Sequence, residues 1–289
     1  MGVFSVVVDS FMHVVSVLLV TSLFCLSFLR RFVLLLPRQN RPFLKRIQLV
    51  ALYCEVPIVR RAVQQFGVAT CFPQMINELS WGTLKTTVLS MQPGVVRAPF
   101  CFVPSLPHNV EEARLPASVN ALKQEFEKVR IELDCLLDLK VPFDLFFGTW
   151  FTYDFWLYGE KKAQHAQACP ETYRLLSQIE TLLHNSQCGF SKLAAEDRIG
   201  NHCDAHSTNL RLRVHLGLRG CNTECYLVEG QRKKTWTEGS LMVLDTTFQH
   251  YAVNNSEEDR YVLLFDIWHP SLKKDDIEAL KRLDRFFDH

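Results

Sequence analysis

The chain has 289 residues, 48% of them hydrophobic, which is enough to bury the core of one catalytic-size domain or of two small ones. Its 32 lysines and arginines are balanced by 31 aspartates and glutamates, so that the formal net charge is +1. This balance excludes the strongly positive character of many nucleic-acid-binding proteins, and we expect no nucleic-acid partner.

The N-terminal part contains one long uncharged segment, from Ser10 to Leu29. As a helix this segment would be roughly 30 Å long, about the thickness of a bilayer's hydrocarbon core. It predicts an N-terminal transmembrane helix, with residues 1–36 as a membrane anchor. A cleaved signal peptide is the alternative, but no basic residue precedes the apolar run and no small-x-small cleavage site follows it.

Charges around this segment indicate an orientation. Asp9 is the only charge before it, whereas basic residues follow closely, namely Arg30, Arg31, Arg38, Arg41, Lys45 and Arg46. The positive-inside rule then predicts a single-pass membrane protein whose remaining chain lies in the cytoplasm.

The cysteines give little information about the compartment. Ten of them occur at irregular spacings, which does not resemble a disulfide framework and is compatible with a reducing environment. The pairing of Cys221 with Cys225 stays open. One glycosylation sequon, Asn254-Asn255-Ser256, points to a secretory environment, but so short a pattern often occurs by chance.

Residues 37–103 are interpreted as a linker or irregular region, because "IQLVALYCEVPIV" is too short to cross a bilayer and "MQPGVVRAPF" is typical of a loop. Residues 104–289 are expected to form the catalytic domain. Its first helix is predicted over Ser118–Lys140, where apolar residues recur at helical spacing. A second helix is predicted over Pro170–Leu183, with Pro170 in its first turn.

After Gly189 the apolar pattern changes to every second residue. In "LRLRVHLGL" the residues Leu210, Leu212, Val214, Leu216 and Leu218 face one way, and Arg211, Arg213, His215 and Gly217 face the other. Two more strand-rich stretches follow, "GSLMVLDTTFQHYAV" and "RYVLLFDIWHP", with "TWTEG" as a turn before the first. Helices followed by strands indicate an α+β fold in which helices back a β-sandwich or barrel.

Polar residues in this second half suggest a metal site. His202 and Asp204, two apart in an extended segment, point to the same side. Non-haem Fe(II) oxygenases use two histidines and one carboxylate on one face of the metal, and His250 is the best candidate for the third ligand. Ten residues later Arg260 opens the last strand, where its guanidinium could bind a carboxylate through two hydrogen bonds.

Each of these residues also has an ordinary interpretation. His-Cys-Asp is more often a cap or a surface loop, His250 a hydrogen-bonded strand histidine, and Arg260 a solvated strand start. Their joint order and spacing, together with the cationic face of Arg213 and His215, favour the oxygenase interpretation.

A larger set of motifs carries a family resemblance: "FWLYG", "ACPETYRLL", "GFSKL", "HCD", "TNLRLRVHLGL", "TWTEGSLMVLDTTFQH" and "RYVLLFDIWHPSL". From about Pro104 to Leu272 the chain resembles the aspartyl/asparaginyl β-hydroxylase family of Fe(II)/2-oxoglutarate-dependent dioxygenases. The resemblance implies a double-stranded β-helix, a jelly-roll or cupin-like core, in which His202, Asp204 and His250 bind Fe(II) and O₂ takes an open position. It implies that 2-oxoglutarate is bound by Arg213, His215 and Arg260, with help from Ser191 and the backbone at Leu193. Trp156 lines the pocket or belongs to the core.

The chain departs from the family pattern near the first histidine. Some animal members have glycine at the position of Asp204, so that a complete facial triad here is closer to the wider oxygenase superfamily. About two extra residues follow Asp204, which makes His206 a rival to His202 as a ligand. Cys203 is expected to point away from the metal, and a thiolate ligand is the alternative.

The resemblance implies that the chain hydroxylates a C–H bond, and the first expectation is the β-carbon of Asp or Asn residues in a protein substrate. A lipid acyl chain is the alternative substrate, because bacterial relatives act on lipids. A catalytically inactive binding module and a structural membrane adaptor remain as non-enzymatic alternatives. Animal relatives act in the lumen of the endoplasmic reticulum, so the resemblance favours the lumen whereas the charge bias favours the cytoplasm.

Overall fold

The computed structural model describes residues 49–50, 52–72, 101–204 and 208–287. The chain divides into two compact units, which are described separately. One contains residues 106–271, and the other contains the described residues 49–72, 101–105 and 272–287.

The unit of residues 106–271 is built from two antiparallel sheets. The larger sheet has the strand order β1-β2-β4-β11-β6-β9, with β3 paired to β2, and the smaller has the order β5-β10-β7-β8. The strands of the larger sheet are β1 Asp144–Phe147, β2 Trp150–Leu157, β3 Glu160–Lys161, β4 Gln187–Leu193, β6 Arg211–Arg219, β9 Leu241–Leu244 and β11 Arg260–Trp268. Those of the smaller sheet are β5 Asp197–His202, β7 Cys225–Glu229, β8 Arg232–Thr235 and β10 His250–Asn254.

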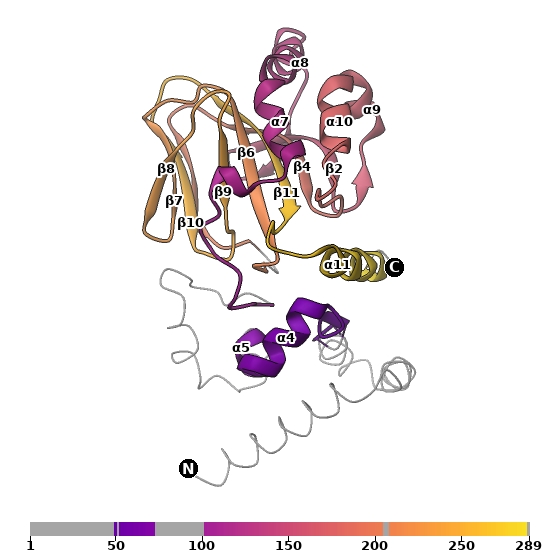
Figure 1. Ribbon diagram of the computed structural model, residues 1–289. Helices are drawn as coiled ribbons and strands as arrows, with labels where there is room; N and C mark the ends of the chain where they lie inside the picture. The colour runs from indigo at the N-terminus through magenta and orange to yellow at the C-terminus, as the bar shows by residue number, and fades with distance from the viewer. Residues whose placement is uncertain (1–48, 51, 73–100, 205–207, 288–289) are drawn as a thin grey trace, which may run out of the picture. The chain divides into compact units, whose positions relative to one another are not determined.

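Helices cover the outer face of the larger sheet (Figure 1). They are the short 3₁₀ helix η3 Glu112–Arg114 and the α-helices α7 Ala117–Gln124, α8 Phe126–Asp138, α9 Ala163–Ala168 and α10 Pro170–Ser177. A core forms where Leu122, Leu133 and Leu176 of the helices meet Phe190 and Phe265 of the sheet. The expected α+β fold, with helices backing a β-sandwich, is confirmed.

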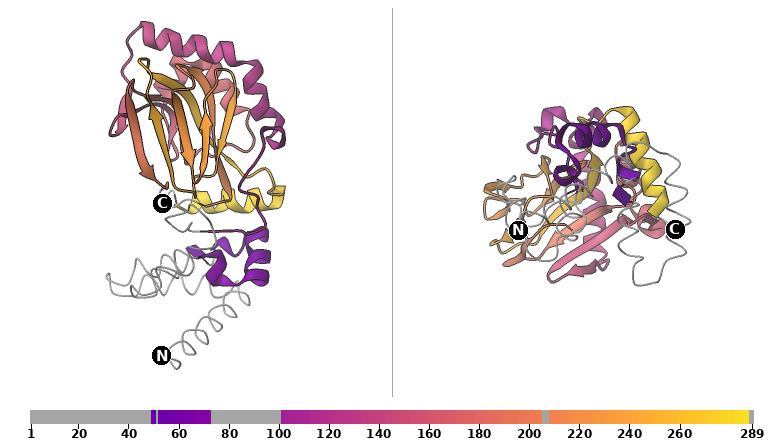
Figure 2. Two further views of the ribbon diagram at one scale, coloured as in Figure 1. Left: turned by 90° about the vertical axis from the view of Figure 1, so that its left-hand side faces the viewer. Right: turned by 90° about the horizontal axis from the view of Figure 1, so that it is seen from below.

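The two faces of β11 show why this strand is buried along its whole length. Leu263 and Phe265 belong to the core under the helices, whereas Val262 and Leu264 belong to a second core shared with Leu227 of the smaller sheet. Alternate residues of a strand point to opposite faces, so a strand covered on both sides has apolar residues throughout. Figure 2 shows the two sheets from other directions.

Strand β6 has the predicted alternation. Leu212, Val214, Leu216 and Leu218 lie in the core under the helices, which leaves Arg213 and His215 on the face toward the smaller sheet. The predicted strand stretches after it form β9, β10 and β11.

The helices differ from the sequence prediction in their extent. The segment predicted as one helix over Ser118–Lys140 is broken at Glu125, whose backbone has φ −98° and ψ 10°. The predicted helix over Pro170–Leu183 stops at Ser177. The chain then runs beside β11, where Leu183 N donates to Asp266 O and Trp268 N donates to Thr181 O. These backbone hydrogen bonds replace those of a further helical turn.

Asn254, the asparagine of the sequon, is fully buried at the end of β10. Its Nδ2 donates to the backbone oxygens of Leu193, Ala194 and Glu258 at 3.3, 3.0 and 2.8 Å. The amide therefore serves to hold two chain segments together. All nine cysteines within the described residues are free, including Cys221 and Cys225, in agreement with the absence of a disulfide framework.

The other unit contains α4 Pro57–Phe66, α5 Val68–Cys71 and α11 Lys274–Phe287. The buried carboxylate of Asp276 accepts from Ile58 N at 2.7 Å and from Lys273 N at 3.1 Å, so that one side chain caps two helix N-termini. The helix α11 was not predicted from the sequence, and α4 lies in the region interpreted as a linker.

The predicted transmembrane helix and single-pass membrane localisation are contradicted. Among the residues that the structure describes, no helix is both long and apolar enough to cross a bilayer. The segment Ser10–Leu29, on which that prediction rested, lies outside the described residues. The domain boundaries at residues 36 and 103 stay predictions.

Asp154 on β2 is expected to make stability depend on pH. Burial raises the pKa of its carboxyl group from 3.8 to about 6, although Thr152 and Gln187 donate hydrogen bonds to it. The folded chain therefore keeps this proton where the unfolded chain has lost it, and the stability that it contributes is complete below pH 3.8 and lost as the pH rises through 6.

The shift of about two pKa units corresponds to about 3 kcal/mol. We expect Asp154→Asn to be more stable than the wild-type chain above pH 6, and the difference to shrink as the pH falls toward 4. Urea unfolding of both proteins over this range measures it. A stability difference that does not change with pH would contradict the assignment.

Candidate functional site

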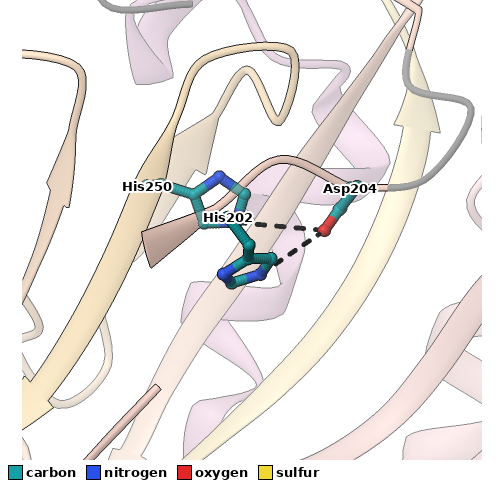
Figure 3. A group of neighbouring side chains, drawn as sticks. All are labelled: His202, Asp204 and His250. Atoms are coloured by element: carbon teal, nitrogen blue, oxygen red, sulfur yellow. Dashed lines mark ion pairs between the residues drawn. The ribbon is translucent and has the colours of Figure 1, made fainter. Parts of the chain in front are cut away.

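Three side chains that could bind a metal meet where β5 and β10 pair. The antiparallel register places His250 opposite His202, and Asp204 follows two residues after the end of β5. Asp204 Oδ1 lies 3.8 Å from His202 Nε2 and 3.9 Å from His250 Nε2 (Figure 3). Two ligand atoms that share one ion at about 2.1 Å lie about 3 to 4 Å apart, so the spacing suits a single metal ion.

Both histidines turn the same nitrogen toward this centre. His202 Nδ1 lies 2.7 Å from Gly200 O, and His250 Nδ1 lies 2.9 Å from Phe248 O. A backbone carbonyl can only accept, so the proton is on Nδ1 and the lone pair of Nε2 faces Asp204. Each of the two imidazoles is thus oriented by the main chain as a metal ligand would be.

The protonation states also suit a metal. Burial lowers the pKa of His250, even though the Asp204 charge opposes this, and the imidazole is neutral at neutral pH. Burial alone would raise the pKa of Asp204, but the positive charges of Arg213 and Arg211 oppose this and the net pKa is lowered. The site therefore offers a neutral imidazole from His250 and an ionised carboxylate from Asp204, with the imidazole of His202 beside them.

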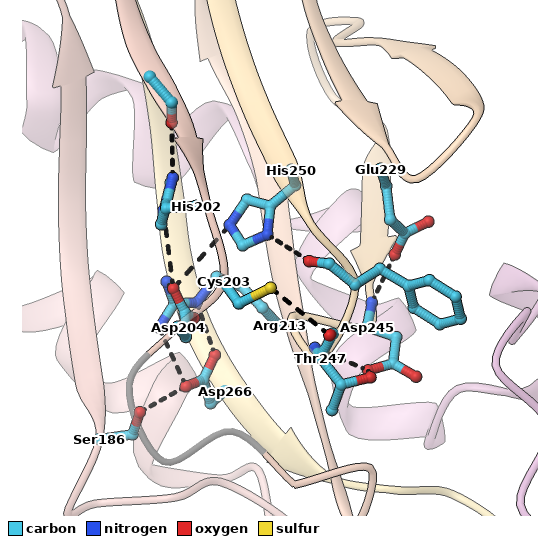
Figure 4. Close-up of polar contacts among 12 residues, drawn as sticks. Ser186, His202, Cys203, Asp204, Arg213, Glu229, Asp245, Thr247, His250 and Asp266 are labelled. Carbon is cyan, nitrogen blue, oxygen red and sulfur yellow. Dashed lines mark hydrogen bonds and ion pairs between the residues drawn. The ribbon is translucent and has the colours of Figure 1, made fainter. Parts of the chain in front are cut away.

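Arg213 links Asp204 to a second buried carboxylate. Its Nη1 lies 3.2 Å from Asp204 Oδ2, while Nε and Nη2 donate to the two oxygens of Asp266 at 2.9 and 3.2 Å (Figure 4). Ser186 donates a further hydrogen bond to Asp266. Arg213 and Asp266 are direct neighbours on β6 and β11, so the sheet register sets this pair. Its predicted role in binding 2-oxoglutarate stays a prediction.

Removal of the Asp266 charge is expected to disturb Asp204 through Arg213. Residues that orient metal ligands typically contribute about 10- to 100-fold to metal affinity. We expect Asp266→Asn to weaken Mn(II) binding by about this factor in calorimetric titrations.

Asp134→Asn is the matched control, because Asp134 lies on α8 and forms a solvent-exposed ion pair with Arg219 at 2.8 Å, outside the metal-binding group. Equal Mn(II) affinities for Asp266→Asn and Asp134→Asn would show that Asp266 has no part in orienting Asp204.

A second group of polar side chains lies on the facing strands β4, β6 and β11. Arg260 is 2% exposed, and its Nε and Nη1 have no hydrogen-bond partner within the described residues. His215 Nε2 is also buried and lacks a partner there. Burial, together with the positive charges of Arg260 and Arg213, holds the pKa of His215 well below its usual value.

Ser191 and Leu193 complete the predicted set. The Ser191 hydroxyl accepts a hydrogen bond from Trp150 Nε1 at 2.8 Å, which leaves its own O–H available to donate. Leu193 is fully buried, and its backbone pairs with Arg260 across β4 and β11. The buried, unpaired donors of Arg260 and His215 are suited to an anionic ligand such as a carboxylate.

Other predicted residues lie elsewhere. The Trp156 ring stacks on Tyr173 at 4.8 Å and meets His184 at 5.0 Å within the helix-side core, which favours its interpretation as a core residue. Cys203 is not part of the metal-binding group, as expected, and its Sγ lies 3.7 Å from Thr247 O. The rival ligand His206 lies outside the described residues.

Two tryptophans that the sequence prediction left out contact this group. Trp150 donates to Ser191, and Trp236 donates to His215 Nδ1 at 3.1 Å. Trp236 stands in "TWTEG", which was interpreted only as a turn. The signal that could have found it is a large aromatic residue in a turn, because such a residue needs burial.

Comparisons with known proteins show which family the chain resembles. The family model of aspartyl/asparaginyl β-hydroxylase matches residues 109–270. The mouse protein named aspartate β-hydroxylase domain-containing protein 2 is 29% identical over 260 residues, which cover 80% of this chain and 75% of that protein. Human aspartyl/asparaginyl β-hydroxylase is 30% identical over 133 residues, which cover 43% of this chain and 16% of that protein.

Among solved structures, the cupin domain of Cnp3 from Schizosaccharomyces pombe aligns with 50% of this chain and 76% of its own, at 7% identity and a TM-score of 0.31. The match to the family model is much more specific than this structural alignment. It spans more than half of the 289 residues and includes both sheets, the His202–Asp204–His250 cluster and Arg260. The chain therefore belongs to the aspartyl/asparaginyl β-hydroxylase family.

Proposed function

We propose that the chain is an Fe(II)- and 2-oxoglutarate-dependent dioxygenase that hydroxylates a C–H bond. One observation carries the proposal: Arg213, which contacts Asp204 of the His202–Asp204–His250 cluster, shares a face of β6 with His215. The buried Nε2 of His215, and Nε and Nη1 of Arg260, have no partner among the described residues. A metal alone would explain the cluster but not the donors. A dicarboxylic acid explains the cluster and the donors together, because one end can bind the metal and the other end can accept hydrogen bonds from Arg260 and His215.

The residues present fit both groups. His202, Asp204 and His250 would hold Fe(II), because their ligand atoms all lie within 4.8 Å of one another. The far carboxylate of 2-oxoglutarate would be held by Nε and Nη1 of Arg260 and by Nε2 of His215, and the Ser191 hydroxyl is free to donate as well. The structure records no ion pair of Arg260 with a described residue. Burying an unpaired guanidinium costs free energy, and an anionic ligand would lower that cost.

When bound together, iron, O₂ and 2-oxoglutarate supply the oxidising power for hydroxylation, with succinate and CO₂ as co-products. The protein's own residues orient the metal ligands and set their protonation states. Gly200 O and Phe248 O keep the two imidazoles aimed at the centre, and Arg213 keeps Asp204 ionised beside them. The apolar core around Leu193, Val262 and Leu264 limits the access of water to the carboxylate-binding end.

For the substrate we propose an Asp or Asn residue of a protein, hydroxylated at its β-carbon. Two similar proteins support this choice through their names, which contain aspartate β-hydroxylase and aspartyl/asparaginyl β-hydroxylase. A lipid acyl chain and an inactive binding module are the alternatives that the test separates.

The test has a binding arm and a turnover arm. Purified chain is titrated with Fe(II) and then 2-oxoglutarate without oxygen, and succinate is measured after air is admitted. We expect stoichiometric binding of both and succinate release. Products heavier by one oxygen atom are then sought by mass spectrometry in added peptides that contain Asp and Asn, and in added lipids. Binding without succinate would indicate a binding module, and no binding at all would end the proposal.

A further inference from the structure

The indole of Trp236 contacts two residues that carry the proposed function. Trp236 follows β8 directly and is 2% exposed, packed in the core between the two sheets. Its Nε1 donates to His215 Nδ1 at 3.1 Å, and the guanidinium carbon of Arg260 lies 4.5 Å from the centre of its ring. One rigid side chain thus contacts both His215 and Arg260, which have unpaired buried donors within the described part of the site.

The contact with His215 determines which imidazole nitrogen carries the proton. An indole N–H only donates, so His215 Nδ1 must be the acceptor. A neutral imidazole with an unprotonated Nδ1 has its proton on Nε2. That Nε2 is buried and has no partner within the described residues, so Trp236 presets His215 as a donor on its open side.

The guanidinium of Arg260 contacts the face of the Trp236 ring. A guanidinium that stacks on an aromatic ring keeps the N–H groups at its edge available for hydrogen bonds. Two such groups, on Nε and Nη1, lack partners among the described residues. Trp236 therefore fixes the plane of the guanidinium without using these donors.

We propose that Trp236 is a positioning residue for a bound carboxylate. By fixing the tautomer of His215 and the guanidinium plane of Arg260, it makes three N–H groups available to one carboxylate ligand. The inference rests on the proposed function, which supplies 2-oxoglutarate as that ligand.

Trp236→Phe tests the hydrogen bond separately from the stacking, because phenylalanine keeps a ring beneath Arg260 but has no N–H. Without the indole donor His215 divides between two tautomers, and one of them turns a lone pair toward the carboxylate. We expect the Kd for 2-oxoglutarate, measured by calorimetry on Mn(II)-loaded protein, to rise about tenfold. The Kd for Mn(II) itself should stay unchanged.

The matched control is Trp268→Phe, the same substitution at a buried tryptophan of β11 outside this group. It should leave both Kd values unchanged. The inference is overturned if Trp236→Phe binds 2-oxoglutarate as tightly as the wild-type chain, or if it loses Mn(II) affinity to the same degree.

Nitrogen-15 NMR of His215 gives a readout that needs no variant. We expect the wild-type chain to show a protonated Nε2 and an unprotonated Nδ1, and Trp236→Phe to show a mixture. A protonated Nδ1 in the wild-type chain would overturn the inference even if the variant did not fold. Failure of the wild-type chain to bind 2-oxoglutarate would instead overturn the proposed function, which distinguishes the two failures.

Discussion

His250→Ala is expected to abolish succinate release, with a loss of at least about 1,000-fold. His250 is 7% exposed, and its Nε2 faces Asp204 across the cluster. Alanine leaves only one imidazole and one carboxylate, and two ligands hold a divalent ion much less tightly than three. Mn(II) calorimetry and the succinate assay should therefore both show the loss.

The control is His184→Ala, because His184 is exposed and lies beside Trp156, away from the cluster. It should bind Mn(II) and release succinate like the wild-type chain. Succinate release that survives in His250→Ala would mean that the turnover does not depend on the proposed metal site. A circular-dichroism melt of each variant checks that the chain is folded.

Arg260→Ala is expected to raise the Kd for 2-oxoglutarate by about 100-fold or more, since losing one partner of a buried charge pair costs about 2 to 5 kcal/mol. Arg260 is the cation with two unpaired, buried N–H groups in the described part of the site. Arg260→Lys keeps the charge but loses the planar guanidinium and its paired N–H groups. Its Kd should therefore lie between those of the wild-type chain and Arg260→Ala. Calorimetry on Mn(II)-loaded protein measures all three.

The comparison with Arg213 makes this prediction specific. Both arginines are implied by the family resemblance to bind 2-oxoglutarate, but Arg213 already faces Asp204 and Asp266. If Arg260→Ala bound 2-oxoglutarate normally, the assignment of its carboxylate to Arg260 would be wrong. Arg219→Ala, on the exposed end of β6, controls for the loss of a positive charge.

Much of the site could be predicted because it depends on strand periodicity and on a short motif. The alternation in residues 210–218 placed Arg213 and His215 on one face, and the structure agrees. His202 and Asp204 needed only an extended segment to share a side. His250 was chosen as the third ligand from its place in a later predicted strand, but the register that pairs β5 with β10 is not contained in the local sequence.

The features that the sequence did not predict depend on contacts between residues that are distant in the chain. Periodicity showed which face Arg213 occupies, but not that Asp266 stands opposite it on β11. The same holds for Trp236, whose position is explained by a hydrogen bond to His215 on another strand. The helix over 170–183 was predicted too long because its last residues hydrogen-bond to β11, a long-range competitor that helical propensity does not include.

The pairing of His202 with His250 has a further consequence for how the chain holds together. The two imidazoles come from neighbouring strands that are far apart in sequence, so an ion bound by both would act as a reversible cross-link between them. Such a link forms only when the strands are assembled, and its binding energy is added to the stability of the native state. The supply of metal would then affect the stability of the folded chain as well as its chemistry.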